Sequence, residues 1–294
     1  MADLKAIKKR IGSVQNTRQI TRAMKMVAAA KLRRSQDAII SSRPYAYRIY
    51  SILLGLFQQE GISHPLLAQR PEKKIRLIVL AGDRGLCGSF NASIFKEAQK
   101  FLKMKKEENV EVVLDVIGKK AYDFFKKRYP VQTHHEGLLG KTTFTRVAAI
   151  ADELLEAFKK EELDAIYIIY NEFKSAISQK ITVERLVPVS DEVPEGVAGV
   201  WTATEAENMK DYIFEPEKDK LLEEIVPRHF RMQFFRCVLE SVASEHGARM
   251  SAMENATQNA SEMIGSLTLE YNKARQEKIT RELTEIVGGV EAMK

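Results

Sequence analysis

Residues 75–106 read IRLIVLAGDRGLCGSFNASIFKEAQKFLKMKK, and three patterns follow one another in this stretch. The apolar run IRLIVLA (75–81) is typical of a buried strand. The segment ASIFKEAQKFLKMKK (92–106) has the apolar spacing of a helix. The residues between them are rich in glycine, and a glycine-rich loop between a strand and a helix often binds nucleotide phosphates. The stretch therefore predicts an α/β fold and raises the question of whether the chain binds a nucleotide.

The same alternation continues after this stretch. Short apolar runs rich in β-branched residues lie at 110–118 and 163–170, and segments with helical spacing lie at 119–128 and 144–160. Strands that alternate with helices predict a parallel sheet covered by helices, here a Rossmann-like α/β domain over about residues 70–200. The run ITVERLVPV (181–189) predicts one more strand at a sheet edge, because Pro188 cannot donate a ladder hydrogen bond.

The glycine-rich loop fits neither of the two common phosphate-binding patterns. A P-loop places a lysine directly after its last glycine, and a dinucleotide fingerprint reads G-x-G-x-x-G. Here Gly82, Gly85 and Gly88 have the spacing G-x-x-G-x-x-G, and Ser89 follows. We interpret the loop as a turn whose glycines allow positive φ or close backbone approach. No histidine or cysteine cluster has the spacing of a catalytic or metal site, so we expect no catalytic, cofactor-binding or metal-binding residues.

The two ends of the chain carry a different pattern. Leu4, Ile7, Ile11 and Val14 have the spacing of a heptad seam, within a segment whose first proline is Pro44. The 67 residues after Pro227 contain no proline. We therefore predict a long antiparallel coiled coil of an N-terminal helix (1–60) and a C-terminal helix (208–294). Beyond Val14 the next heptad positions are taken by Arg18, Thr21 and Lys25. The apolar face is therefore expected to shift by a stutter to Ile20, Met24 and Val27. On the second helix, the seam is expected at Leu239, Val242, His246, Arg249, Met253, Ala256, Ala260, Met263 and Leu267.

Equal rise per residue predicts that the C-terminal helix is longer than its partner. If Tyr50 lies level with Pro227, Asp3 lies level with about residue 274, and residues 275–294 project beyond the pair. The projecting part carries a second apolar stripe, Ile279, Leu283, Ile286 and Val290. Because glycine disfavours helix, the last turn is expected to fray at Gly288–Gly289.

Positive charge is concentrated at the N-terminus. Residues 1–36 contain ten basic residues and one acid, a net charge of +9, which leaves −3 for residues 37–294 out of a total of +6. This basic arm suits a shaft that runs against acidic protein surfaces. Two alternatives remain open at this point: a basic coiled-coil scaffold that binds nucleic acid, and a Rossmann-type enzyme that uses the sheet domain. Against nucleic acid, the arm has no aromatic residue before Tyr45 on which a base could stack.

Cysteine usage and the lengths of the apolar runs predict that the chain is located in a reducing compartment and does not insert into a membrane. Cys87 and Cys237 are far apart and make no disulfide framework. The first residues contain no apolar core of signal-peptide length, and no apolar run approaches the ~20 residues that cross a bilayer. We expect any membrane association to be through partners.

Three long motifs resemble the gamma subunit of bacterial F-type ATP synthases, in that family's order and over essentially the whole chain. They are VQNTRQITRAMKMVAAAKLRRSQ (14–36), GDRGLCGSFN (82–91), and ASEHGARMSAMENATQN (243–259) followed by LEYNKARQEKITRELTEIVGG (269–289). The family often has a second glycine where this chain has Ser89.

This resemblance implies a non-catalytic rotary shaft that transmits torque between a membrane c-subunit ring and a catalytic ring of three alpha and three beta subunits. It implies an epsilon subunit as a further partner, no cofactor, and a peripheral place at the cytoplasmic face of the bacterial inner membrane. It also implies contact or coupling roles toward beta. The matching positions in this sequence are Met24, Lys25, Arg249, Gln276, Thr280 and Glu282.

Overall fold

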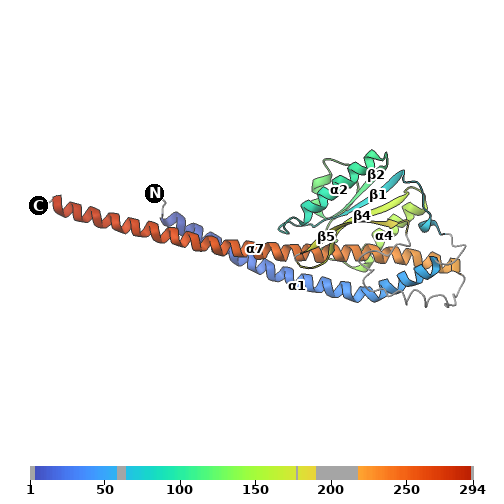
Figure 1. Cartoon of the computed structure of the whole chain (residues 1–294), viewed down its shortest axis with the longest axis horizontal. Helices are drawn as coiled ribbons and strands as arrows, with labels where there is room; N and C mark the ends of the chain where they lie inside the picture. The colour runs from blue at the N-terminus through green and yellow to red at the C-terminus, as the bar shows by residue number, and fades with distance from the viewer. Residues whose placement is uncertain (1–3, 58–63, 177, 190–217, 293–294) are drawn as a thin grey trace. The chain divides into compact units, whose positions relative to one another are not determined.

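The computed structural model describes residues 4–57, 64–176, 178–189 and 218–292 (Figure 1). Contacts divide the chain into two compact units. The helix-pair unit consists of the residues up to Ala29 and from Arg249 onward. The sheet unit consists of Ala30–Ala248. Both long helices have residues in both units. The predicted boundary at 200 lies outside the described residues.

Two long helices dominate the chain. Helix α1 spans Leu4–Phe57 and continues through Pro44, and helix α7 spans Lys218–Ala292 and continues through Pro227. The expected start of the second helix at 208 lies outside the described residues. The expected fraying at Gly288–Gly289 is wrong, because α7 remains helical through both glycines to Ala292.

Within the helix-pair unit, α1 and α7 run antiparallel. The Lys25 ammonium lies 2.5 Å from a Glu254 carboxylate oxygen, and the hydroxyls of Thr21 and Thr257 lie 2.8 Å apart. As the α1 number rises, the number of its α7 partner falls. The predicted antiparallel pair is therefore confirmed in this unit.

The seam of α1 keeps one unbroken heptad register, so the predicted stutter is wrong. The half-buried or buried positions continue from Val14 through Arg18, Thr21, Lys25 and Ala28. Ile20 and Val27, which were expected on the apolar face, are 60% and 56% exposed. A regular heptad repeat keeps the same stripe of each helix against its partner, and here that stripe is polar for three successive seam positions.

The seam of α7 in this unit also follows a strict heptad. Its inward positions are Met253, Thr257, Ala260, Ile264, Leu267, Tyr271 and Ala274. Met263, which the sequence had placed in the seam, is 45% exposed, and its neighbour Ile264 takes the inward position.

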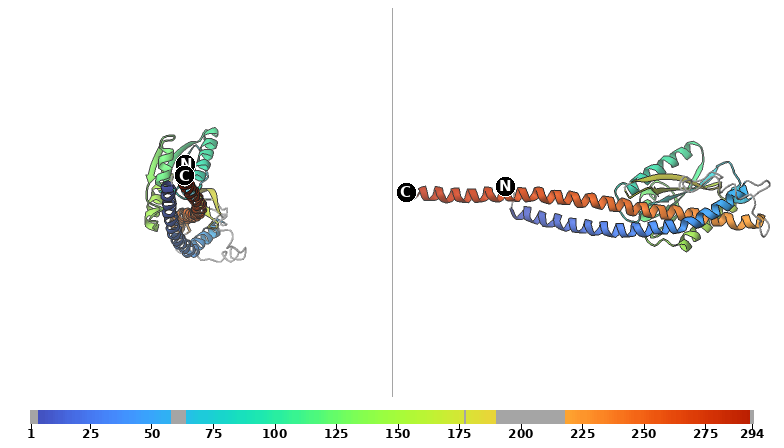
Figure 2. Two further views of the ribbon diagram at one scale, coloured as in Figure 1. Left: turned by 90° about the vertical axis from the view of Figure 1, so that its left-hand side faces the viewer. Right: turned by 60° about the horizontal axis from the view of Figure 1, so that its bottom comes forward.

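The projection of α7 beyond its partner is confirmed. Ala274 is the last half-buried residue of α7, and every residue from 275 to 289 is exposed. Leu4, the first residue of α1, and Ala274 lie equally many residues from the Thr21–Thr257 hydrogen bond, so the exposure begins where the partner helix ends. Figure 2 shows α7 continuing past the start of α1. We call residues 275–289 the tip.

The sheet unit contains a five-stranded sheet in the order β3-β2-β1-β4-β5. The first four of these strands are parallel and β5 is antiparallel to β4, at the predicted edge. Strand β3 was not predicted, because VQTHH is short and carries little apolar character. The elements after α1 are η1 (Pro65–Leu67), β1 (Lys74–Leu80), α2 (Phe90–Glu107), β2 (Glu111–Ile117), α3 (Lys119–Phe125), β3 (Val131–His135), α4 (Phe144–Lys159), β4 (Ala165–Phe173) and β5 (Gln179–Val187).

Helices cover both faces of this sheet. On one face, Ile75, Leu77 and Val79 of β1 pack in a cluster with α2 and α3. On the other face, Ile78 and Leu80 pack in a cluster with α4 and with residues of α7 and α1. Alternate residues of β1 therefore enter two separate cores, which explains why its sequence is apolar from Leu77 onward.

The loop between β1 and α2 is a structural junction. The Asn91 side chain accepts a hydrogen bond from the Gly82 amide at 2.9 Å, and the Asp83 carboxylate accepts from the backbone amides of Lys119 and Gly137. A Cβ on Gly82 would lie 3.0 Å from the Glu245 carboxyl group of α7. The loop is therefore bonded to the start of α2 and to the segments after β2 and β3, and Gly82 approaches α7 closely, which agrees with its interpretation as a sheet-to-helix turn.

Candidate partner interface

The described residues offer two surfaces that could bind other proteins: the basic face of α1 and the tip of α7. Among the described parts of the chain, no group of three or more metal-ligating side chains is present. No described helix is long and apolar enough to cross a membrane. The cysteine thiols do not suggest a reactive site either, since both are buried and burial raises the pKa of the Cys237 thiol.

The basic residues of α1 that form what we call its basic face are exposed to solvent. Lys8, Lys9 and Arg10 are exposed in the helix-pair unit, as are Lys31, Arg33 and Arg34 further along the helix. None of these six cations forms an ion pair with any residue that the structure describes. Lys25 differs from them, because it is half-buried and its ammonium is paired with Glu254. Most of the predicted charge excess is therefore available to an external acidic surface.

The tip presents large apolar side chains to solvent. Ile279, Leu283, Ile286 and Val287 are each between 47% and 63% exposed, and they follow one another at helical spacing. Such a stripe on a helix without an intramolecular partner is typical of a protein interface. It is flanked by charged residues, one pair of which is Lys278–Glu282 at 3.6 Å.

The predicted coupling residues fall into two groups. Met24 and Lys25 are half-buried on α1, beside the α7 turn that carries Glu254. Gln276, Thr280 and Glu282 are exposed on the tip, where the structure describes no residue of α1. The sixth, Arg249, is half-buried and is the first α7 residue of the helix-pair unit. The structure therefore does not bring the six residues together into one site.

Sequence reasoning missed two polar partners inside the pair. Glu254 forms an ion pair with Lys25, and the Thr257 hydroxyl forms a hydrogen bond with that of Thr21. The heptad spacing that begins at Leu4 does reach Arg18 when it is extended without a break. The sequence analysis set this register aside in favour of the shifted one, because Ile20 and Val27 are the larger hydrophobes.

A polar clamp holds α7 to the sheet inside the sheet unit. One Arg236 guanidinium nitrogen donates to both Glu184 carboxylate oxygens at 2.7 Å, and the other terminal nitrogen donates to the Tyr170 hydroxyl at 3.1 Å. One turn on, the Glu240 carboxylate accepts from the Phe173 amide at 2.9 Å. Burial raises the pKa of Glu240. We call these groups the clamp. Directional bonds of this kind fix the position of α7 along β4 and β5.

Comparisons with known proteins agree with this architecture. The family model described as ATP synthase matches residues 3–293. The ATP synthase gamma chain of Geobacter metallireducens is 48% identical over 295 residues, and that of an Anaeromyxobacter species is 45% identical over 300, with all of both chains covered in each case.

Solved structures show a similar fold. A chain from a Euglena gracilis mitochondrial ATP synthase structure, described as OSCP/F1/c-ring, has a TM-score of 0.66 at 21% identity and covers 99% of this chain and 94% of its own. A chain from a Tetrahymena thermophila structure, described as central stalk/c-ring, has a TM-score of 0.59 at 24% identity and covers 81% of this chain and 99% of its own. By the family match and the full-length identity, this chain belongs to the family of ATP synthase gamma chains.

Proposed function

We propose that this chain is the central rotary shaft of a bacterial F-type ATP synthase. In this role it transmits torque between a c-subunit ring in the membrane and a catalytic ring of three alpha and three beta subunits. The observation that carries the proposal is the tip, a helix with an apolar stripe that lies beyond its own partner helix. A surrounding ring of subunits would bury that stripe, and the exposed basic face of α1 would meet acidic surfaces of the same ring.

The mechanism follows from asymmetry. One shaft inside a three-fold ring presents a different face to each beta subunit, so it biases each beta conformation differently, and rotation exchanges these biases. Met24, Lys25 and Arg249 would act along the pair, and Gln276, Thr280 and Glu282 would act at the tip. The two terminal segments, predicted as helices over 1–60 and 208–294, form the shaft in this proposal. The α/β domain predicted at 70–200 forms its foot with the epsilon subunit and the c-ring.

The chain itself would catalyse nothing and hold no cofactor. Catalytic sites would lie on the partner subunits, and the chain would be peripheral at the cytoplasmic face of the inner membrane. The glycine-rich loop supports a non-catalytic role, because its side-chain and backbone groups are engaged in joining the sheet to its helices.

Co-expression tests the proposed assembly directly. We expect the full chain to co-purify with alpha and beta subunits as one complex that hydrolyses ATP, and the chain alone to show no ATP turnover. The competing function, a nucleic-acid scaffold, predicts instead that the chain shifts labelled DNA at physiological salt and ignores alpha and beta. Failure to form a complex with alpha and beta would reject the shaft.

The basic arm is expected to act through its summed charge. A single Arg33→Gln change should weaken torque transfer by less than about fivefold, because an exposed ion pair contributes ~0–1 kcal/mol. Exchanging Lys8, Lys9, Arg10, Arg33 and Arg34 together for glutamine should weaken it by tenfold or more. The measurement is ATP-driven rotation of the assembled complex under load.

A charge-matched control separates the arm from net charge. Five exposed lysines of the sheet unit can be exchanged for glutamine with the same change in total charge, and rotation should then stay near the parent value. Equal defects in the arm and control variants would contradict the proposal. The control positions are Lys96, Lys106, Lys120, Lys127 and Lys141.

A further inference from the structure

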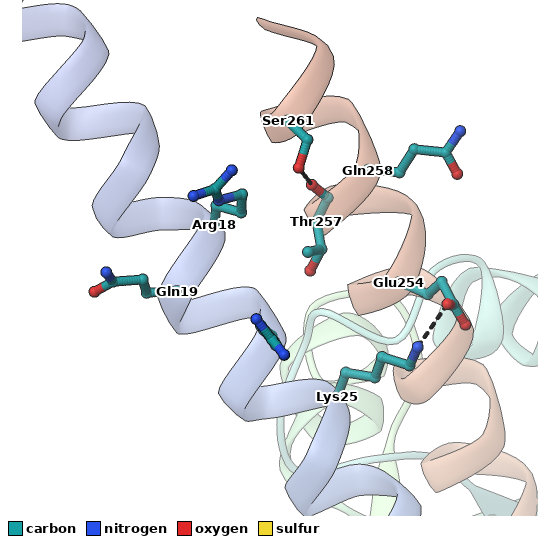
Figure 3. Close-up of a pocket in the computed structure, with 8 residues that line it drawn as sticks. Arg18, Gln19, Lys25, Glu254, Thr257, Gln258 and Ser261 are labelled. Carbon is teal, nitrogen blue, oxygen red and sulfur yellow. Dashed lines mark hydrogen bonds and ion pairs between the residues drawn. The ribbon is translucent and has the colours of Figure 1, made fainter. Parts of the chain in front are cut away.

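A cavity of about 540 Å³ lies between α1 and α7 in the helix-pair unit (Figure 3). Helix α1 lines it with Arg18, Arg22 and Lys25, and α7 lines it with Glu254, Thr257 and Ser261. In Figure 3 the Arg18 side chain points into the space between the helices, whereas Gln19 and Gln258 point away from it. The cavity therefore has a cationic wall on one helix and hydroxyl groups on the other.

The charges around this cavity do not balance. Its three cations face one carboxylate, and Glu254 is already paired with Lys25 at 2.5 Å. Neither Arg18 nor Arg22 forms an ion pair with any residue in the described parts of the chain. The half-buried guanidinium of Arg18 and the exposed guanidinium of Arg22 thus line one cavity, and no carboxylate of the described residues neutralises either of them.

Arg18 occupies an unusual position for an unpaired cation. It lies at a heptad seam position, between Val14 and Thr21, and it is half-buried there. Removing a charge from water costs free energy unless a partner of opposite charge replaces the water. An apolar residue at this position would stabilise the pair at no such cost. A mobile anion in the cavity would supply the counterpart that Arg18 lacks among the described residues.

The side chains that line the cavity determine which kind of anion fits it. A guanidinium presents parallel N–H groups that match two oxygens of a phosphate, and two guanidinium groups can each donate to the same polyvalent oxyanion. On the other side, the Thr257 and Ser261 hydroxyls already donate to the Met253 and Thr257 carbonyls, so the donors open to an anion are those of the arginines. We propose that this cavity is a binding site for a phosphate group, with Arg18 and Arg22 as its principal ligands.

Binding would also couple the anion to the helix pair. The anion contacts α1 through both arginines and lies against α7, so it stabilises the paired state and not the separated helices. This inference concerns the free chain and does not depend on the proposed shaft function. A failure of either one leaves the other standing.

Titration of the full chain with inorganic phosphate tests the site. At constant ionic strength, calorimetry should show saturable binding of about one phosphate per chain, accompanied by a rise in the temperature of thermal unfolding. Arg18→Gln and Arg22→Gln should each weaken binding by about tenfold or more, because a charge-assisted hydrogen bond contributes about 1.5–3 kcal/mol. Arg18→Lys keeps the charge but loses the planar fork, so it should bind with intermediate affinity.

A charge-matched control and a second ligand complete the experiment. The double variant Lys8→Gln/Lys9→Gln removes two charges from the same helix outside the cavity, and it should bind phosphate like the parent chain. Titration with ATP distinguishes free phosphate from the phosphate groups of a nucleotide as the source. Circular dichroism confirms that each variant keeps its helices. Non-saturable binding, or equal loss in the cavity and control variants, would overturn the proposal.

Discussion

Replacing Arg236 by methionine should lower the free energy of unfolding of the full chain by about 3–5 kcal/mol. The side chains of Arg236 and Glu184 are only 12% and 16% exposed, so the substitution leaves a buried carboxylate without its cation. It also removes the bond from Arg236 to the Tyr170 hydroxyl. Chemical denaturation followed by circular dichroism measures the effect.

Two further variants assign this loss to the uncompensated charge. The double variant Arg236→Met/Glu184→Gln removes both charges, and it should recover most of the lost stability. Arg228→Met breaks the exposed pair with Glu224 on the same helix, and it should cost about 1 kcal/mol or less. If Arg228→Met and Arg236→Met lower the free energy of unfolding by the same amount, the clamp is not what holds α7 to the sheet.

The clamp also shows why polar bonds between α7 and the sheet are useful in a protein that transmits torque. Apolar side chains would hold α7 against β4 and β5 through contacts that tolerate sliding, since the hydrophobic effect is not directional. The Arg236 bonds to Glu184 and the Glu240 bond to the Phe173 amide each require one position along the strands. In the proposed function, a torque applied to the sheet therefore passes to α7 without a shift of register.

The sequence predicted the elements that rest on local periodicity. Four of the five strands and the helices α2, α3 and α4 lie where apolar spacing placed them. Strand β1 is buried from Ile75 to Leu80, and each of these helices buries its apolar side. Strand β3 was missed for a physical reason. It lies at the edge of the sheet beside β2, where Val131–His135 are largely half-buried and need no apolar pattern.

The seam of the helix pair shows where residue type misleads. Ile20 and Val27 are the most apolar choices near the predicted shift, yet they face outward, and Arg18, Thr21 and Lys25 face α7. The register is set over many residues by the heptad beginning at Leu4, so three polar positions are carried inward with it. The charge excess and the tip were predictable by counting, but the cavity at Arg18 requires the α7 partner, which spacing along one helix does not supply.

Removing residues 276–294 should damage both assembly and rotation, whereas removing 288–294 should leave both largely intact. The longer deletion removes Gln276, Thr280 and Glu282 together with the exposed stripe, and the shorter one spares all of them. In the proposed function, burial of each large apolar side chain of the tip contributes about 1.5–3 kcal/mol to docking in the ring. The measurements are the yield of the complex with alpha and beta, and its ATP-driven rotation.

A full-length variant separates the stripe from helix length. Exchanging Ile279, Leu283 and Ile286 together for serine should weaken assembly by at least about a hundredfold, given the burial expected for each. These side chains are exposed in the free chain, so its unfolding should change little. That contrast matters, because a general folding defect would lower stability and assembly together. Two outcomes would show that the ring does not bind the shaft through this stripe. One is a serine variant that assembles and rotates like the parent, and the other is a severe defect from the seven-residue deletion alone.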